Sequence, residues 1–143
     1  MVRTLTLLAL LALGSCGQPV PRPAGVAEES TADRVEVLSF HAKRRCATCL
    51  AIEHLTHEVV ASEFAGALAD SSLLLRVVDI SEEEALADRY EVAWSSLLLH
   101  GRIRGADTVI DLTRFAFDNA RRNPEAFKSG LKAEIGKLLD IKQ

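Results

Sequence analysis

The sequence predicts an α/β domain with a four-stranded mixed central sheet and flanking helices, in the order strand, helix, strand, helix, strand, strand, helix. Three observations support this prediction: short apolar or alternating runs, longer segments with apolar residues at helical spacing, and turn residues between them. The first strand, helix and strand form a parallel unit with a right-handed crossover.

The first half of the domain supplies this parallel unit. Residues 35–40 alternate and then become apolar, as a strand entering a core does. Residues 47–68 carry apolar side chains at helical spacing, with glutamates such as Glu53 on the opposite side. Residues 72–80 form a mainly apolar run with two charges, which is typical of a central strand covered on both faces.

A short helix and a strand pair follow. Ser81 and Glu84 form a Ser-x-x-Glu capping box, which predicts that a helix starts there and continues to about Tyr90. Residues 95–101 and 107–112 read as strands joined by a short turn, so they should pair antiparallel.

The C-terminal helix has the clearest pattern in the chain. Asn123 is a good N-cap, and Pro124 suits the first turn. One apolar face follows, formed by Phe127, Leu131, Ile135, Leu138 and Leu139. A less regular helical stretch, residues 112–120, precedes it.

The N-terminal segment predicts export. Of the 143 residues, 48% are hydrophobic and 26% charged, which fits one globular domain. Residues 1–15 hold a single basic residue and then an apolar run, as in a signal peptide, and the run is too short to span a bilayer. Leu13-Gly14-Ser15-Cys16 resembles the bacterial lipobox. This resemblance implies that Cys16 is lipidated and becomes the first residue of the mature protein.

The lipobox resemblance implies a lipid-anchored protein in the bacterial cell envelope, facing the periplasm. Gly17, where Asp would favour retention, points to the outer membrane. Residues 16–33 contain three of the four prolines and read as a flexible tether, so the folded domain spans residues 34–143. Without the signal peptide, 16 basic and 20 acidic residues remain, a net charge of about −4. We therefore expect no nucleic-acid partner, and we expect a monomer.

Lipidation of Cys16 leaves one cysteine pair, Cys46 and Cys49, within the segment RRCATC. The pair stands at the start of the first predicted helix, where unpaired N–H groups and the helix dipole favour a thiolate. This placement, joined to the order of elements, resembles the thioredoxin superfamily over the whole chain after the tether. The resemblance implies a thiol-disulfide oxidoreductase with no cofactor beyond its own redox-active disulfide. Cys46 would attack a protein thiol or disulfide substrate, and Cys49 would resolve the mixed disulfide.

Neighbouring residues qualify as supporting groups. Arg44 and Arg45 would favour the Cys46 thiolate by their charge, or else they belong to a solvated loop. His41 ends the first strand, where it would relay a proton to Cys49 or serve only as a polar strand end. By the resemblance, the loop bearing Trp94 faces the cysteine pair. With Tyr90, Trp94 would line a partner groove or cover the edge of the core.

The sequence also departs from the thioredoxin pattern. The usual Trp and Gly-Pro around the pair are missing, and so is the buried acid about six positions before the first Cys. The position of the family's cis-proline, before the third strand, is occupied by Ser96. Its loss would remove a docking point for substrate and leave room for a metal.

Two alternatives therefore stay open. In one, the domain binds or delivers zinc or copper through Cys46 and Cys49. A histidine or a second molecule would complete the metal shell. His54 and His57 are the candidate ligands, but they lie at least a turn down the helix, and His100 reads as a strand end. In the other, the domain is a binding module with a permanent structural disulfide, although so small a loop stabilises little.

Overall fold

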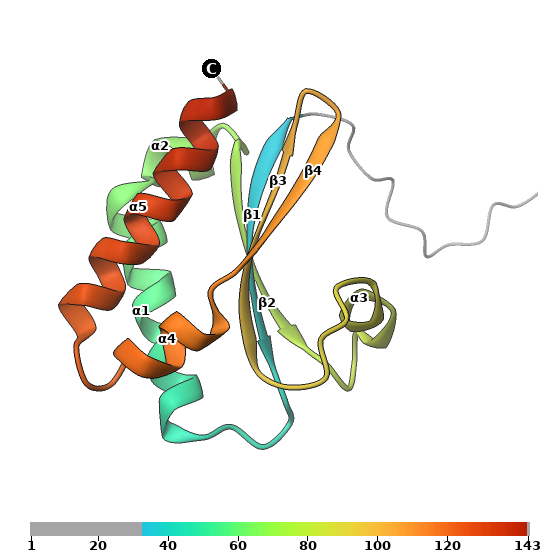
Figure 1. Cartoon of the computed structure of the whole chain (residues 1–143), viewed down its shortest axis with the longest axis vertical. Helices are drawn as coiled ribbons and strands as arrows, with labels where there is room; N and C mark the ends of the chain where they lie inside the picture. The colour runs from blue at the N-terminus through green and yellow to red at the C-terminus, as the bar shows by residue number, and fades with distance from the viewer. Residues whose placement is uncertain (1–32, 143) are drawn as a thin grey trace, which may run out of the picture. The chain divides into compact units, whose positions relative to one another are not determined.

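The computed structural model describes residues 33–142, which form one α/β domain (Figure 1). The predicted signal peptide, the lipidation site Cys16 and nearly all of the predicted tether lie outside these residues. The elements are β1 (Arg34–His41), α1 (Ala47–Glu63), α2 (Ala65–Ala69), β2 (Leu73–Asp79), α3 (Glu84–Arg89), β3 (Ser96–Ile103), β4 (Ala106–Asp111), α4 (Thr113–Asn119) and α5 (Pro124–Lys142).

The sheet has the predicted mixed arrangement, with strand order β2-β1-β3-β4. β1 pairs parallel with β2, so α1 and α2 make the crossover between them. β1 pairs antiparallel with β3, and β3 pairs antiparallel with β4 through a tight turn. Arg104 and Gly105 form this turn with φ of 53° and 78°, the left-handed conformation that a two-residue hairpin requires. β1 is therefore a central strand, and its C-terminal end pairs with β2 on one side and β3 on the other.

Helices cover the two faces of the sheet unequally. α1, α2, α4 and α5 lie on one face, and the short α3 lies on the other (Figure 1). Side chains of β1 point alternately to the two faces of the sheet. Val35 and Val37 belong to the main core, whereas Leu38 and Phe40 belong to a smaller core with Ala87 of α3. β1 is thus buried on both faces over most of its length.

Two local predictions need correction. The helix predicted over residues 47–68 is divided at Phe64, where φ of −128° and ψ of 27° interrupt it. The capping box of Ser81 is not formed, because Ser81 donates its hydroxyl (2.6 Å) and its N–H (2.9 Å) to Asp79 Oδ1. Glu83 precedes α3 without any side-chain cap. A hydrogen bond donated to an ionised carboxylate is stronger than the neutral one that the serine hydroxyl would accept from a helix N–H, so Asp79 fixes the serine side chain.

The C-terminal helix matches its prediction. Asn123 Oδ1 accepts a hydrogen bond from the N–H of Ala126 (3.4 Å), and α5 starts at Pro124. The predicted apolar face is buried at Phe127, Leu131, Ile135 and Leu138. Along α1, Lys128 pairs with Glu58 and Lys132 pairs with Glu63. Within residues 33–142, none of the helices combines the length and the apolar character needed to cross a membrane.

Candidate redox site

The cysteine pair occupies the first turn of α1. Cys46 is the N-cap, with extended backbone (φ −84°, ψ 162°), and its sulfur accepts a hydrogen bond from the N–H of Cys49 (3.1 Å). The two residues form a disulfide, and their Cα atoms are 5.1 Å apart. Cys46 is exposed and Cys49 is half-buried. A sulfur released at Cys46 would therefore meet solvent and the free amide groups of a helix N-terminus.

A small hollow lies beside Cys49. Its walls come from four elements or their ends, which are distant in sequence but converge here. The lining residues are Ser39, Phe40 and His41 of β1, Cys49, Ile52 and Glu53 of α1, Ser95 and Ser96 at the start of β3, and Phe117 of α4. Two groups able to exchange protons, His41 and Glu53, therefore line the same hollow as Cys49.

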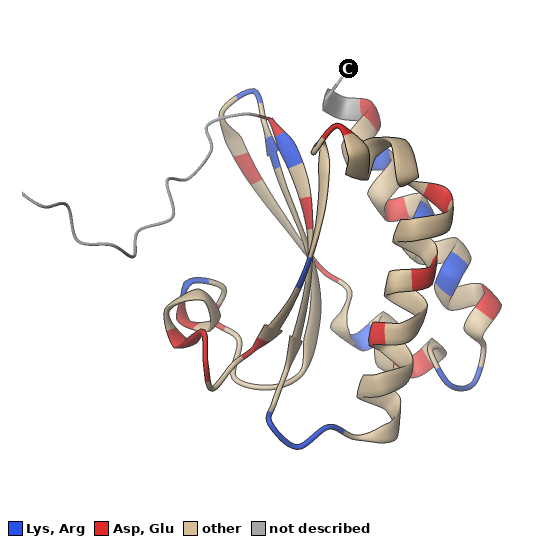
Figure 2. Ribbon diagram, turned by 180° about the vertical axis from the view of Figure 1, so that it is seen from behind, with Lys and Arg blue, Asp and Glu red and all other residues tan. Residues whose placement is uncertain are grey.

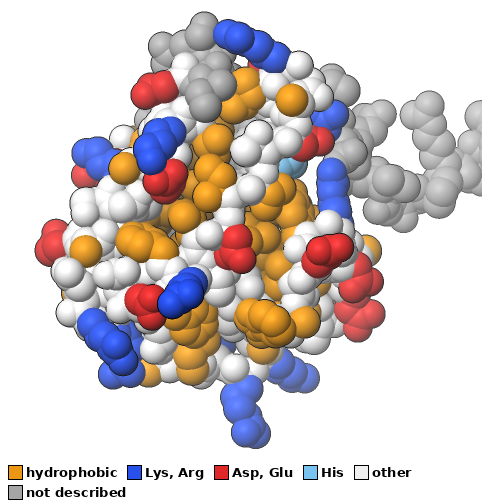
Figure 3. Space-filling view, viewed as in Figure 1, with side chains coloured by type: hydrophobic (Ala, Val, Ile, Leu, Met, Phe, Trp, Pro, Cys, Tyr) orange, Lys and Arg blue, Asp and Glu red, His pale blue; other side chains and the backbone are white. Residues whose placement is uncertain are grey.

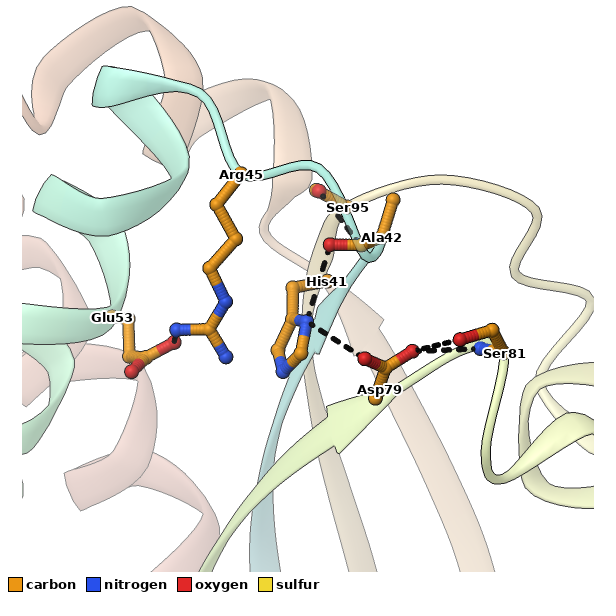
Figure 4. A network of polar contacts seen from close by, with 7 residues as sticks. All are labelled: His41, Ala42, Arg45, Glu53, Asp79, Ser81 and Ser95. Carbon is orange, nitrogen blue, oxygen red and sulfur yellow. Dashed lines mark hydrogen bonds and ion pairs between the residues drawn. The ribbon is translucent and has the colours of Figure 1, made fainter.

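His41 is held at the end of β1 by acceptors on one side of its ring (Figure 4). Its Nδ1 atom lies 3.3 Å from the carbonyl oxygen of Ala42 and 3.9 Å from Asp79 Oδ2. Because both neighbours are acceptors, the proton is favoured on Nδ1 and Nε2 is left able to accept. His41 and Asp79 also stand opposite each other in the parallel pairing of β1 and β2, which brings them together.

Asp79 stays ionised in this arrangement. The hydroxyl and then the N–H of Ser81 hold the pKa of Asp79 below its usual value by hydrogen bonding, against a smaller opposing effect of burial. His41, when it is protonated, and Arg45 lower the pKa of Asp79 further by their charge. A fixed negative charge therefore faces the ring of His41.

The two arginines before Cys46 differ in their surroundings. Arg45 is half-buried and donates from Nη1 to Glu53 Oε2 at 2.7 Å (Figure 4). Arg44 is exposed in the loop between β1 and α1. Arg45 thus joins the loop to α1 one turn beyond Cys49, while Arg44 points its charge into solvent near the disulfide.

These features decide the fold. β1 leads into the cysteine pair, the pair opens α1, and the sheet order is β2-β1-β3-β4. The fold is thioredoxin-like. Together with the disulfide, it supports a redox role for the domain.

Comparison with known proteins gives weak similarities. A thioredoxin from Thermus thermophilus aligns with a TM-score of 0.40 and 19% identity over 75% of this chain and 72% of that chain. A structure described only as a malarial protein aligns with a TM-score of 0.39 and 20% identity over 59% of this chain and 93% of that one. No protein-family model and no curated protein matches the sequence. The fold assignment therefore rests on the order of elements and the placement of the cysteines.

The position expected for the cis-proline lies in the site. Ser96 lines the hollow beside Cys49, and its hydroxyl donates to the carbonyl oxygen of Trp94 (3.0 Å). Ser95 Oγ accepts a hydrogen bond from the N–H of Ala42 (3.4 Å), which ties the loop before Cys46 to the start of β3. Every peptide bond within the described residues is trans.

Trp94 lies at the rim of a second hollow. It is 69% exposed and lines this hollow together with Thr113, Arg114 and Phe117. Phe117 lines both hollows and so connects Trp94 with Cys49. Tyr90, in contrast, packs against Phe40 in the smaller core with a ring separation of 6.0 Å, and it is an edge aromatic of that core.

Sequence reasoning missed several site residues. Glu53 was assigned to the exposed side of the first helix, but it is half-buried at the hollow and paired with Arg45. Asp79 falls within the predicted strand 72–80, and Phe117 within the less regular helical stretch 112–120, without any role in the site. No local signal marks them, since the sheet register brings Asp79 to His41, the salt bridge to Arg45 holds Glu53 at the hollow, and the packing of α4 places Phe117 there.

The remaining histidines lie away from the pair. His54 and His57 are exposed on α1, as expected from their spacing. His100 is not a strand end but a buried residue within β3, where Nδ1 lies 2.8 Å from the Tyr90 hydroxyl and Nε2 lies 3.1 Å from Asp107 Oδ1. Within residues 33–142, no three His, Cys, Asp or Glu side chains are grouped as a metal site would require. The donor set there offers zinc or copper two sulfurs and no third ligand.

Proposed function

We propose that the domain is a thiol-disulfide oxidoreductase in which Cys46 attacks and Cys49 resolves. The observation that carries this proposal is the position of the disulfide at the N-cap of α1, with the outer sulfur exposed and hydrogen-bonded to the N–H of Cys49. A negative charge at this place is stabilised by the helix N-terminus, so a thiolate at Cys46 is a good nucleophile and leaving group. Exposure lets a substrate sulfur approach in line with it.

The exchange has two steps. In the reducing direction, the Cys46 thiolate attacks one sulfur of a substrate disulfide, and the other substrate sulfur leaves as a thiolate and takes a proton. Cys49 loses its proton and attacks Cys46, which releases the second substrate thiol and restores the Cys46–Cys49 disulfide. His41 lines the same hollow as Cys49 and presents Nε2 as an acceptor, and we assign it as the acceptor of that proton.

Cysteine substitutions test the proposal directly. Cys46→Ser should abolish exchange with a model disulfide while leaving the fold unchanged in circular dichroism. Cys49→Ser should instead accumulate a mixed disulfide between Cys46 and the substrate, which mass spectrometry detects. An exchange rate unchanged in Cys46→Ser would remove the proposal.

A redox titration with thiol alkylation separates the alternatives. A reversible two-electron transition between about −120 and −270 mV is expected of a catalytic pair. A pair that stays oxidised below about −300 mV would instead be a structural disulfide. Stoichiometric protection of the thiols by added zinc or copper would favour metal binding or delivery.

The proposed setting is the bacterial cell envelope. A lipid anchor on Cys16 would hold the domain on the periplasmic face of a membrane, with the outer membrane as the expected site. Support comes from the lipobox-like sequence and from the cysteine pair, since disulfide chemistry suits an oxidising compartment.

A further inference from the structure

Three consecutive basic residues, Lys43, Arg44 and Arg45, precede the reactive cysteine. The whole chain carries a formal net charge of −3, so this run opposes the general charge of the protein. Figure 2 shows it as a continuous basic loop between β1 and α1. Arg45 is neutralised by Glu53, but Lys43 and Arg44 are exposed, and neither has a carboxylate within ion-pair distance among residues 33–142. The loop therefore presents two unpaired positive charges next to Cys46.

Three large apolar side chains near the pair are also exposed. Leu50, directly after Cys49, is 49% exposed, and Phe117 is 38% exposed between the two hollows. Trp94 shares the second hollow with Phe117 and is exposed as well. Apolar and basic side chains also lie together in the space-filling view, at the end of the domain where α1 begins (Figure 3). Isolated exposed apolar residues are ordinary, but large ones near a cysteine pair, two of them lining adjacent hollows, indicate a contact surface.

Nearby acidic groups do not cancel the positive charge of the loop. Asp111, which lines the second hollow, accepts a hydrogen bond from the N–H of Thr113 (2.8 Å) and so belongs to the start of α4. Asp118 lies 3.9 Å from the exposed Arg114. Asp79 lies against His41 and Ser81. None of these three carboxylates pairs with Lys43 or Arg44, so both positive charges of the loop stay available to a ligand.

We propose that this surface selects one substrate class: extended protein segments that carry acidic residues beside their cysteine and an apolar residue that enters the hollow between Trp94 and Phe117. This inference rests on the proposed thiol-disulfide exchange and names its substrate. The basic loop directly precedes Cys46, whereas Phe117 stands between the hollow beside Cys49 and the hollow of Trp94, so a ligand must be long enough to reach both. Complementary charge at the rim of a binding surface acts mainly on the association rate and on the choice of partner.

The test compares disulfide-linked dimers of short peptides. Three dimers differ only in the residues flanking the cysteine, which are Glu, Gln or Lys, and a fourth disulfide is the small anion 3,3′-dithiodipropionate. The protein is the full chain with Cys16→Ser, reduced beforehand, so that only Cys46 and Cys49 supply electrons. Release of peptide thiol is followed by chromatography as the cysteine pair is oxidised.

At low salt we expect the acidic dimer to react about tenfold faster than the basic dimer, and the ratio to shrink as salt is added. Lys43→Glu and Arg44→Glu should each lower the acidic-to-basic ratio severalfold. The ratio is the informative quantity, because any change in the reactivity of Cys46 affects both peptides equally. Lys137→Glu, an equal change of charge on the distant half of α5, should leave the ratio unchanged.

A separate experiment tests the apolar contact with Trp94. Trp94→Ala should slow the acidic dimer that has Leu near its cysteine, and should have no effect on the same dimer with Gly there. Equal rates for the acidic, neutral and basic dimers would overturn the substrate assignment and leave the oxidoreductase proposal standing. A small anion that reacts as fast as the acidic peptide would also overturn it. Failure of every disulfide to react would remove the proposed function together with this inference.

Discussion

His41 shows how one residue acquires a chemical role from its neighbours. Thioredoxin-like proteins usually place a buried acid near this point, and here the strand supplies Ser39, Phe40 and His41 instead. The acid lies on the next strand: Asp79 faces His41 across the parallel pairing of β1 and β2. A histidine backed by a fixed carboxylate can take a proton at its free nitrogen, and we propose that this pair takes the place of the single acid.

Replacing His41 tests this assignment. His41→Asn should slow the resolving step about 100-fold, since general-base catalysis of this kind contributes roughly that much. Formation of the mixed disulfide in a Cys49→Ser background should be unaffected. The defect should shrink as pH rises past about 8.5, where free thiols ionise without help.

His54→Asn, at an exposed position of α1, is the matched control. Stopped-flow detection of the mixed disulfide separates the two steps. A defect that is equal in both steps and independent of pH would mean that His41 only supports the structure of the site.

At the scale of the elements, α4 and α5 must pack closely for Phe117 to reach the site. Phe115 of α4 stacks on Phe127 of α5 with ring centroids 6.0 Å apart and planes inclined by 11°. Gly130 makes room for this contact, because a Cβ at that position would collide with the ring of Phe115. A helical glycine is unfavourable by itself, and close packing explains its presence here.

Two alanine substitutions in the same helix separate packing from helix propensity. Gly130→Ala should destabilise the domain by about 1–2 kcal/mol, because overpacking outweighs the gain in propensity. Gly136→Ala meets nothing within 4 Å and should stabilise it by about 0.5–1 kcal/mol. Urea unfolding measures both values. Equal stabilisation by the two substitutions would show that Phe115 does not constrain the helix.

For the whole molecule, the proposed lipid anchor decides which substrates can reach the cysteine pair. Cys16 is expected to carry the lipid, and several acyl chains would anchor the protein stably. The reactive pair would then work beside a membrane, on exported proteins with acidic segments around their cysteines. Both proposals predict that envelope proteins, and not soluble cytoplasmic ones, are the partners.

Expression in a Gram-negative host tests the anchor. The mature protein should begin at Cys16, carry the added mass of acyl chains in mass spectrometry, and sediment with the outer-membrane fraction. Cys16→Ser should retain residues 1–15, because lipidation precedes cleavage in this type of signal. A mature wild-type chain without lipid would contradict the proposal.

The sequence alone determined the main elements and their order. Apolar periodicity located the four strands and the long helices, and cap residues located the start of α5, since these signals are local. The position of the cysteine pair at a helix start was also readable, because the strand before it and the helical pattern after it are clear. Errors arose where local signals compete, as at Ser81, whose hydroxyl bonds to Asp79 instead of capping a helix.

Only the tertiary structure decided the surroundings of the pair. The register of β1 and β2 brings Asp79 to His41, the salt bridge to Arg45 draws Glu53 toward the hollow, and the packing of α4 sets Phe117 between Trp94 and Cys49. His100 is a buried partner of Tyr90 for the same reason. Such contacts join residues far apart in the chain, and they depend on strand pairing and on close packing, which no short stretch of sequence encodes.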